Sequence, residues 1–238
     1  MNRRNDARGG KKKLSGSKSA RPSRRPPKGK HASGKPAKPT KLRIIGGDMR
    51  GRPIVYHGEE FTRPMKDNIR ENLFNILGRA VKNAICFDMF AGTGALALES
   101  ISRGAIRSVA IEQSRRAIGF IEKTAENLGV GDQLKVLNGD AFRLGPDLLG
   151  PPSDDTAWIV YLCPPYILWE ENLEQLNSLI ISFQRHSPPG SVLVAETEKE
   201  FDHDKLPKGD WDLREYGGTR LAFIEPVLQC GLTFDCDI

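Results

Sequence analysis

From residue 84 onward the chain alternates between short apolar runs rich in β-branched residues and stretches whose apolar residues have helical spacing. Five strand and helix alternations of this kind predict an α/β fold, in which helices bury both faces of a mainly parallel sheet. The runs "WDLREYG" and "RLAFIEP" then follow with almost nothing between them, which predicts a closing antiparallel hairpin. The strand-like runs that precede this hairpin are residues 84–90, 106–112, 133–140, 156–165 and 191–197.

Two elements are expected before the sheet. The stretch "KLRIIGGDMRGRPIVYHG" has two β-branched runs around glycines and predicts a strand pair or hairpin. In "TRPMKDNIRENLFNILGRA", Ile69, Leu73, Ile76 and Leu77 recur at helical spacing, and Pro64 suits the first turn of a helix. We therefore expect a hairpin and a helix ahead of the main sheet.

Charge divides the chain into three parts. Residues 1–40 have a net charge of +13 and almost no large apolar side chains, so we expect a disordered basic tail. Residues 41–82 are also basic, at +4, whereas residues 83–238 carry a net charge of −11. A basic tail favours a polyanionic partner, with nucleic acid ahead of a merely solubilising role. The expected organisation is thus a tail, a hairpin and helix that would face nucleic acid, and an acidic folded domain that would carry any catalytic site.

Several classes of protein do not fit this sequence. No apolar run approaches the roughly 20 residues of a membrane span, and the start lacks the apolar stretch of a signal peptide. The cysteines have neither metal-ligand spacing nor the pattern of a small disulfide-rich domain. We expect a cytoplasmic protein without a structural metal. The four cysteines are Cys86, Cys163, Cys230 and Cys236.

The first strand runs into "DMFAGTGALALES", which begins at Asp88. Gly92 and Gly94 allow a sharp turn from strand to helix and a close approach of the backbone to a ligand. The third glycine of the dinucleotide fingerprint and the lysine of a phosphate-binding loop are both missing. The loop therefore favours a ligand that needs room over one that needs a phosphate cradle.

Acidic residues follow three consecutive strands. Glu112 ends the second strand, where an acid can accept hydrogen bonds from both ribose hydroxyls of a nucleoside. Asp140 follows the third, where it can accept the amine of an adenine while Ala141 or Phe142 covers the ring. Glu112 alone could instead be a helix N-terminal acid, and Asp140 an N-cap. Together with Asp88, they predict a slot for an adenosine that carries a non-phosphate group.

The fourth strand ends in "YLCPPY". Methylation of an exocyclic amine is difficult because the lone pair of the nitrogen is delocalised into the base. Acceptors for both N–H groups help the nitrogen to pyramidalise. The Pro164–Pro165 pair fixes φ and exposes a backbone carbonyl that can accept one of them, and Tyr166 can stack on the base. A proline-terminated strand with an aromatic staple is the structural alternative.

These motifs resemble the class I S-adenosylmethionine-dependent methyltransferases, and within them the RsmD-like family of 16S rRNA guanine-N2 methyltransferases. The resemblance runs from about Leu42 to Glu225 and includes "RIIGGDMRGRPI", "TRPMKDNIRENLFNIL", "FDMFAGTGALALESISRGA" and "NGDAF". It implies a seven-stranded Rossmann-like sheet with the last strand antiparallel. It further implies S-adenosyl-L-methionine as cofactor and 16S rRNA or the small ribosomal subunit as partner. We expect a monomer.

The resemblance also assigns residues by position. Asp88, Phe90, Gly92 and Gly94 would line the methionine end of the cofactor, Glu112 would hold the ribose, and Asp140 with Ala141 the adenine. Tyr166 would stack on the target guanine, beside the catalytic Cys163, Pro164 and Pro165. The residues that would face RNA or order the entrance are Arg43, Arg50, Arg52, Arg63 and Arg70.

Cys163 departs from the Asp-Pro-Pro or Asn-Pro-Pro motif of the family. A thiol is a weak hydrogen-bond acceptor, and loss of a well-placed polar group at a transition state commonly costs about 3 to 4 kcal/mol. Three readings remain open: the backbone carbonyl suffices, another acceptor substitutes, or the protein is an inert rRNA-binding homologue. Adenine-N6 methylation uses the same loop chemistry, and a covalent cytosine-C5 mechanism lacks its motif.

Overall fold

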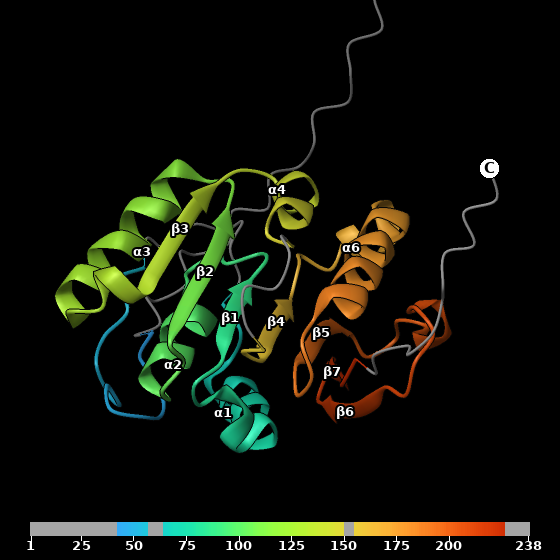
Figure 1. The fold of residues 1–238 in the computed structure, drawn as a ribbon, viewed down its shortest axis with the longest axis horizontal. Coiled ribbons are helices and arrows are strands. Elements are labelled where there is room, and N and C mark those ends of the chain that lie inside the picture. The colour runs from blue at the N-terminus through green and yellow to red at the C-terminus, as the bar shows by residue number, and fades with distance from the viewer. Residues whose placement is uncertain (1–41, 57–63, 150–154, 227–238) are drawn as a thin grey trace, which may run out of the picture. The chain divides into compact units, whose positions relative to one another are not determined.

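The structure is a computed structural model that describes residues 42–56, 64–149 and 155–226. These residues belong to one compact unit, 39–238, and contain a seven-stranded sheet of order β3-β2-β1-β4-β5-β7-β6 (Figure 1). Neighbours pair in parallel from β3 to β5, and β7 pairs antiparallel to both β5 and β6, as predicted. The strands are β1 (Ile85–Asp88), β2 (Arg107–Glu112), β3 (Leu134–Asn138), β4 (Trp158–Leu162), β5 (Val192–Glu198), β6 (Asp212–Tyr216) and β7 (Thr219–Ile224).

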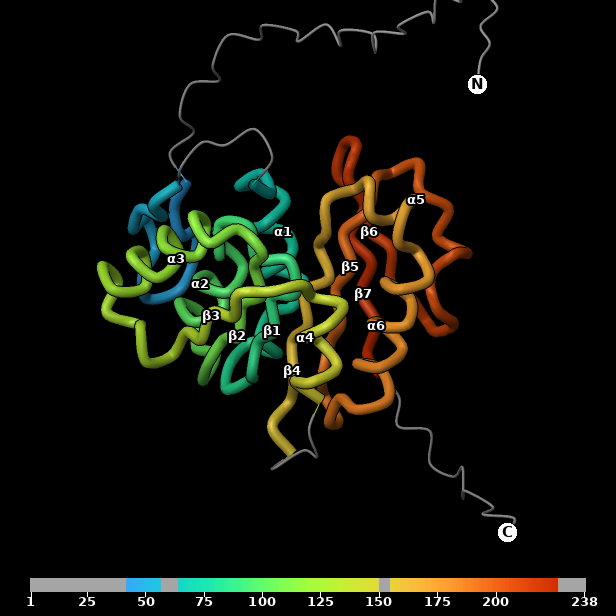
Figure 2. Tube along the Cα trace, turned by 90° about the horizontal axis from the view of Figure 1, so that it is seen from above, coloured from blue at the N-terminus to red at the C-terminus, as the bar shows by residue number. Residues whose placement is uncertain are grey.

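Helices cover both faces of this sheet. Side chains of α1, α2 and α3 pack on one face, and those of α4 and α6 on the other (Figure 2). Strands buried on both faces need apolar residues at every position, which explains the near-continuous apolar runs of β1 and β4. The helices are α1 (Asp67–Leu77), α2 (Ala95–Ser102), α3 (Arg115–Leu128), α4 (Ala141–Asp147), α5 (Leu168–Glu171) and α6 (Leu173–His186), with 3-10 turns η1 (Gly78–Val81), η2 (Gly131–Gln133) and η3 (His203–Lys205).

The two faces of the sheet differ in polarity toward the ends of the strands. On the α6 side, Phe87, Trp158 and Phe183 form an aromatic cluster, with ring centroids 5.1 to 6.3 Å apart. On the α1 side, the strands are apolar in their middle but reach Asp88 at the end of β1. Burial of the aromatic rings stabilises the fold, since each contributes a large apolar area. The other face therefore carries a buried carboxylate at the carboxyl end of β1.

The predicted hairpin at residues 41–56 is looser than two strands. One antiparallel bridge joins Arg43 and Pro53, flanked by bonds from Ile44 N to Arg52 O and from Ile54 N to Leu42 O, both 2.9 Å. The intervening backbone is held by side chains of α2 instead of by a partner strand. The expected strand pair or hairpin is therefore present only as a single antiparallel bridge, and not as two regular strands.

Glu99 and Ser102 of α2 explain this docking. The buried Glu99 carboxylate accepts hydrogen bonds from Ile45 N and Gly46 N, each 2.7 Å. Gly47 has a φ of 73° and lies so close to α2 that a Cβ would be 1.8 Å from the carbonyl oxygen of Ser102. The glycine pair is thus required for the contact with α2.

The helix predicted near Pro64 begins at Asp67, so Pro64 precedes it and does not occupy its first turn. Of the apolar residues expected to face the core, Ile69, Leu73 and Leu77 are buried, whereas Ile76 is 38% exposed. Phe74 fills the core in its place. Across the described parts of the chain, no helix combines the length and hydropathy of a membrane span.

Candidate active site

The carboxyl ends of β3, β2, β1 and β4 lie at one edge of the sheet, because these four strands are parallel neighbours (Figure 1). Asp88 and Glu112 are the last residues of β1 and β2, Asp140 follows β3 by two residues, and Cys163 directly follows β4. Ligands of open α/β sheets bind at this edge. The fold thus brings together the acids and the Pro-Pro loop that were singled out from the sequence.

Glu112 fastens the glycine loop. One of its carboxylate oxygens accepts a hydrogen bond from Gly92 N at 2.7 Å, and the other accepts one from Ser114 N at 2.8 Å. Gly94 has a φ of 71°, and a Cβ there would lie 2.8 Å from a methyl carbon of Ile121. The loop between β1 and α2 therefore tolerates no side chain at Gly94 without repacking of α3.

Asp88 is buried beneath this loop. Neither of its carboxylate oxygens accepts a hydrogen bond from the described residues. Burial raises the pKa of this carboxyl to about 7; the nearby Glu112 charge raises it as well, while the backbone N–H groups of Ala97 and Phe90 oppose the shift. Buried polar groups without partners are rare in folded proteins. A buried acid beside a left-handed glycine turn at a strand end is a candidate ligand site.

Asp140 caps α4, since its side chain accepts a hydrogen bond from Phe142 N at 2.9 Å. This is the structural alternative weighed for Asp140, and it uses one carboxylate oxygen. Ala141 is buried, and the rings of Phe90 and Phe142 meet edge to face with centroids 5.8 Å apart. These two rings form an apolar wall between the first and third strand ends.

The loop after β4 starts at Cys163, which is half-buried. Burial raises the pKa of its thiol well above the ordinary value, and the charges of Glu196 and Asp88 raise it further. The thiol is therefore neutral at pH 7, which removes the thiolate that a covalent mechanism needs. Pro165 and Tyr166 offer their carbonyls to the turn into α5, to Leu168 N and Trp169 N.

Pro164 is buried, but its carbonyl has no hydrogen-bond donor within the described residues. This oxygen is free to accept a hydrogen bond from a substrate. It fits the role that the sequence assigned to the Pro-Pro pair.

Three residues of this region were missed by the sequence reasoning, namely Glu196, Thr219 and Trp169. The Tyr166 hydroxyl donates a hydrogen bond to a Glu196 carboxylate oxygen at 3.0 Å and bonds to the Thr219 hydroxyl at 2.9 Å. Trp169 Nε1 donates to the Glu196 carbonyl at 2.8 Å. One signal could have found Glu196, since it is an acid near the end of the fifth strand.

Of the arginines predicted to face RNA, Arg43, Arg50 and Arg52 are exposed. Arg52 donates to the Asn127 carbonyl at 2.9 Å, and Arg43 lies 3.6 Å from the Asp67 carboxylate. Arg63 lies outside the described residues.

Arg70 does not face outward, so its predicted place on an RNA-binding surface is wrong. Its side chain is fully buried and donates to the Arg43 carbonyl at 2.7 Å and to Asp67 at 3.1 Å. It also lies 3.9 Å from the buried carboxylate of Glu99. Burial lowers the pKa of Arg70, and the charges of Glu99 and Asp67 oppose that shift. The residue links α1 to the docked segment because a buried carboxylate needs a cation.

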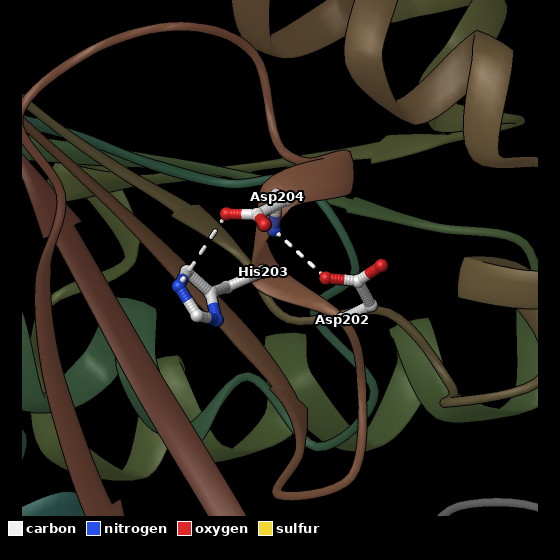
Figure 3. A group of neighbouring side chains, drawn as sticks. All are labelled: Asp202, His203 and Asp204. Atoms are coloured by element: carbon white, nitrogen blue, oxygen red, sulfur yellow. Dashed lines mark hydrogen bonds and ion pairs between the residues drawn. The ribbon is translucent and has the colours of Figure 1, made fainter.

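Two other features lie away from this edge. Asp202, His203 and Asp204 cluster on η3 with exposed side chains (Figure 3). Asp202 caps the turn by accepting from Asp204 N at 3.2 Å, which accounts for the group without a metal. A surface hollow of about 470 Å³ between α3 and β3 lies toward the amino end of β3. Its lining does not include Asp88, Glu112 or Asp140. Neither feature belongs to the site.

Comparison with known proteins identifies the group to which this chain is related. The model of the family "Conserved hypothetical protein 95" matches residues 42–225. The chain belongs to this family. The resemblance to RsmD-like methyltransferases found in the sequence blocks is confirmed, since curated relatives carry that name.

Two such relatives are called ribosomal RNA small subunit methyltransferase D. The one from Escherichia coli K12 is 36% identical over 138 residues, which cover 57% of this chain and 67% of the relative. The one from Buchnera aphidicola of Baizongia pistaciae is 37% identical over 187 residues, 78% of this chain and 91% of the relative.

Solved structures agree on the fold. The structure of yhhF from Escherichia coli, assigned as a methyltransferase, has a TM-score of 0.62 and 29% identity, and covers 80% of this chain and 100% of its own. An RNA methyltransferase from Salinibacter ruber, solved with S-adenosyl-L-homocysteine, has a TM-score of 0.51 at 18% identity and covers 74% of this chain and 100% of its own. At that identity the second likeness concerns the fold alone.

Proposed function

We propose that this chain transfers a methyl group from S-adenosyl-L-methionine to the exocyclic N2 of a guanine in 16S rRNA. The observation that carries this proposal is the position of the Pro-Pro loop beside Asp88. Asp88 pairs with Tyr161 in the register of β1 and β4, and Cys163 follows Tyr161 by two residues on the same face. A base held by the loop and a methyl donor held at the end of β1 would therefore be adjacent. The names of the relatives support small-subunit rRNA as the substrate.

The residues at the strand ends suit this cofactor. Asp88 is buried without a hydrogen-bond partner in the described chain, and the turn at Gly94 brings bare backbone to the same place. Glu112 uses each carboxylate oxygen once, and a carboxylate has about four lone-pair sites, so it retains capacity for the ribose hydroxyls. Asp140 and Ala141 would hold the adenine. When bound, S-adenosyl-L-methionine supplies an electrophilic methyl group on a sulfonium.

The chain's own groups do the rest by positioning. The guanine amine is a neutral nucleophile, so alignment and polarisation of its N–H groups carry the rate in place of a strong base. The Pro164 carbonyl accepts one N–H, and the Tyr166 ring stacks on the base. Ile167, which is 50% exposed, extends the same surface outward.

RNA recognition would use the basic N-terminal part. Arg43, Arg50 and Arg52 stand exposed on the segment that docks on α2, and positive side chains bind phosphates by releasing counterions. Arg63 and the +13 tail would add to this charge. We propose that the protein acts as a cytoplasmic monomer on the small subunit or its rRNA.

A catalytically inert rRNA-binding homologue is the second candidate, and Cys163 is the observation that favours it. The thiol offers a poor acceptor at a position where the chemistry needs an oxygen. Calorimetric measurement of S-adenosyl-L-methionine binding distinguishes the two candidate functions, because a degenerate pocket would not bind the cofactor.

The proposal is tested by incubating the protein with the cofactor and with small ribosomal subunits that lack the methyl mark. Mass spectrometry of the digested nucleosides then identifies the product. We expect N2-methylguanosine in the small-subunit rRNA. Its absence contradicts the proposed function, and N6-methyladenosine in its place would show that the enzyme acts on adenine.

A further inference from the structure

The position of Cys163 leaves the reaction short of one good acceptor, and the structure offers a carboxylate next to it. Tyr161 pairs with Val194, and Leu162 with Ala195, in the register of β4 and β5. The next pair would be Cys163 and Glu196. Laterally paired residues of neighbouring strands point to the same face of a sheet, so both side chains lie on the face that carries α1.

Contacts around Glu196 agree with this register. Its charge acts on the Cys163 thiol, and its backbone N–H lies close enough to that sulfur to favour the ionised form. Its side chain accepts the Tyr166 hydroxyl, and its carbonyl accepts Trp169 Nε1. The loop from Cys163 to Trp169 is therefore built around a single residue of β5. Glu196 is half-buried, as a group at the floor of a base pocket would be.

We propose that Glu196 is the acceptor that replaces the missing Asp or Asn, and that it selects guanine over adenine. This inference rests on the proposed function. The Watson–Crick edge of guanine presents N1–H and N2–H side by side, and the two oxygens of a carboxylate accept both. Adenine presents the lone pair of N1 at the same place, which a carboxylate repels.

The reaction balances with this arrangement. Glu196 accepts N1–H and one N2–H, and the Pro164 carbonyl accepts the second N2–H. The N2–CH3 bond forms as the S–CH3 bond of the sulfonium breaks, and the products are S-adenosylhomocysteine and a protonated N2. One N2 proton is then lost to water. The hydrogen bond from Tyr166 occupies one of the about four lone-pair sites of the Glu196 carboxylate.

Glu196→Gln tests the inference on small subunits that lack the mark. We expect kcat/KM to fall about 100-fold, as for other lost transition-state hydrogen bonds, while the Kd for S-adenosyl-L-methionine changes less than about twofold. Glu198→Gln is the matched control, since it makes the same change two residues along the same strand at an exposed position. It should leave kcat/KM unchanged.

A role limited to holding Tyr166 predicts a different pattern. Tyr166→Phe removes the hydroxyl that bonds to Glu196 but keeps the ring. If Glu196 only positions that ring, Tyr166→Phe reproduces the whole loss, and the inference is overturned. We expect Tyr166→Phe to reduce kcat/KM less than about fivefold, the scale of one neutral hydrogen bond.

Specificity is measured at the nucleotide that the wild-type protein methylates. Subunits are reconstituted with adenosine in place of the target guanosine. A glutamine amide donates and accepts side by side, which matches adenine, so Glu196→Gln should narrow the ratio of guanine to adenine methylation at least tenfold. An unchanged ratio contradicts the inference alone, because the wild type still methylates guanine. An inactive wild type contradicts the proposed function and the inference with it.

Discussion

The two halves of the site are held in different ways. In the proposed cofactor half (Asp88, Gly92, Gly94, Glu112 and Asp140), Glu112 and Asp140 each accept a hydrogen bond from a backbone N–H two residues along the chain, and Glu112 accepts a second from Gly92 N on the neighbouring strand's loop. In the substrate half (Cys163 to Tyr166, Glu196 and Thr219), side chains from three strands meet. Tyr166 bonds to residues 30 and 53 positions away. The first half combines local loop motifs at the ends of three neighbouring strands, whereas the second is held by side-chain bonds between residues far apart in the chain.

The largest effect is expected at Asp88, whose buried carboxylate lowers the free energy of unfolding at high pH. Its pKa is about 7 in the folded chain against an ordinary 3.8, so the folded state keeps the proton to higher pH. The free energy of unfolding therefore falls as the pH rises from about 4 to about 7. Asp88→Asn removes this slope and should be more stable than the wild type at pH 8, by up to about 4 kcal/mol.

Urea unfolding at pH 5 and pH 8 measures this difference, with both proteins free of cofactor. If the free energy of unfolding changes equally with pH in the wild type and in Asp88→Asn, the buried Asp88 carboxyl is not the group that destabilises the fold at high pH. A loss of cofactor affinity in the same variant would show that the carboxylate that destabilises the fold also contributes to binding.

Glu112 comes next in size. Glu112→Ala removes the acceptor for Gly92 N and Ser114 N as well as the proposed ribose ligand, and should raise the Kd for S-adenosyl-L-methionine about 100-fold, or about 2 to 3 kcal/mol. Isothermal titration calorimetry measures it, with the exposed α3 residue Glu122→Ala as control. An unchanged Kd for Glu112→Ala would show that Glu112 does not bind the cofactor, and the assignment of this half of the site to the cofactor would then fail.

The exposed arginines should give the smallest effect. Arg50→Ala should weaken RNA binding about threefold at moderate salt and lower the salt slope by about one. Arg214→Ala is the control, because Arg214 is also exposed but is paired with Asp212 on β6. Equal losses in both variants would mean that binding follows total charge and not the surface of the docked segment.

The sequence predicted the position of the acids at the strand ends for a physical reason. Each acid comes at the end of its own strand, and parallel strands bring their carboxyl ends to one edge. The mainly parallel sheet followed from the alternation of apolar and helical stretches, and the closing hairpin from the short connection between its two runs. The roles of these acids toward a cofactor remain predictions.

The errors come from contacts between distant parts of the chain. Arg70 has a polar side chain on an amphipathic helix and was expected at the surface, but Glu99, 29 residues later, sits buried beneath it. The same carboxylate binds Ile45 N and Gly46 N, so the expected hairpin became a docked loop. Glu196 was overlooked because its neighbours, Cys163 and Thr219, lie on other strands. No local pattern encodes such pairs.

A double-mutant cycle of Cys163→Asn and Glu196→Gln tests most directly whether the substrate half works through its carboxylate. The quantity measured is kcat/KM for N2-methylguanosine formation on small subunits. With Glu196 present, Cys163→Asn should change kcat/KM less than about threefold. In the Glu196→Gln background, the new amide should raise kcat/KM about tenfold. The same factor in both backgrounds would contradict the account, because Cys163 and Glu196 would then act independently.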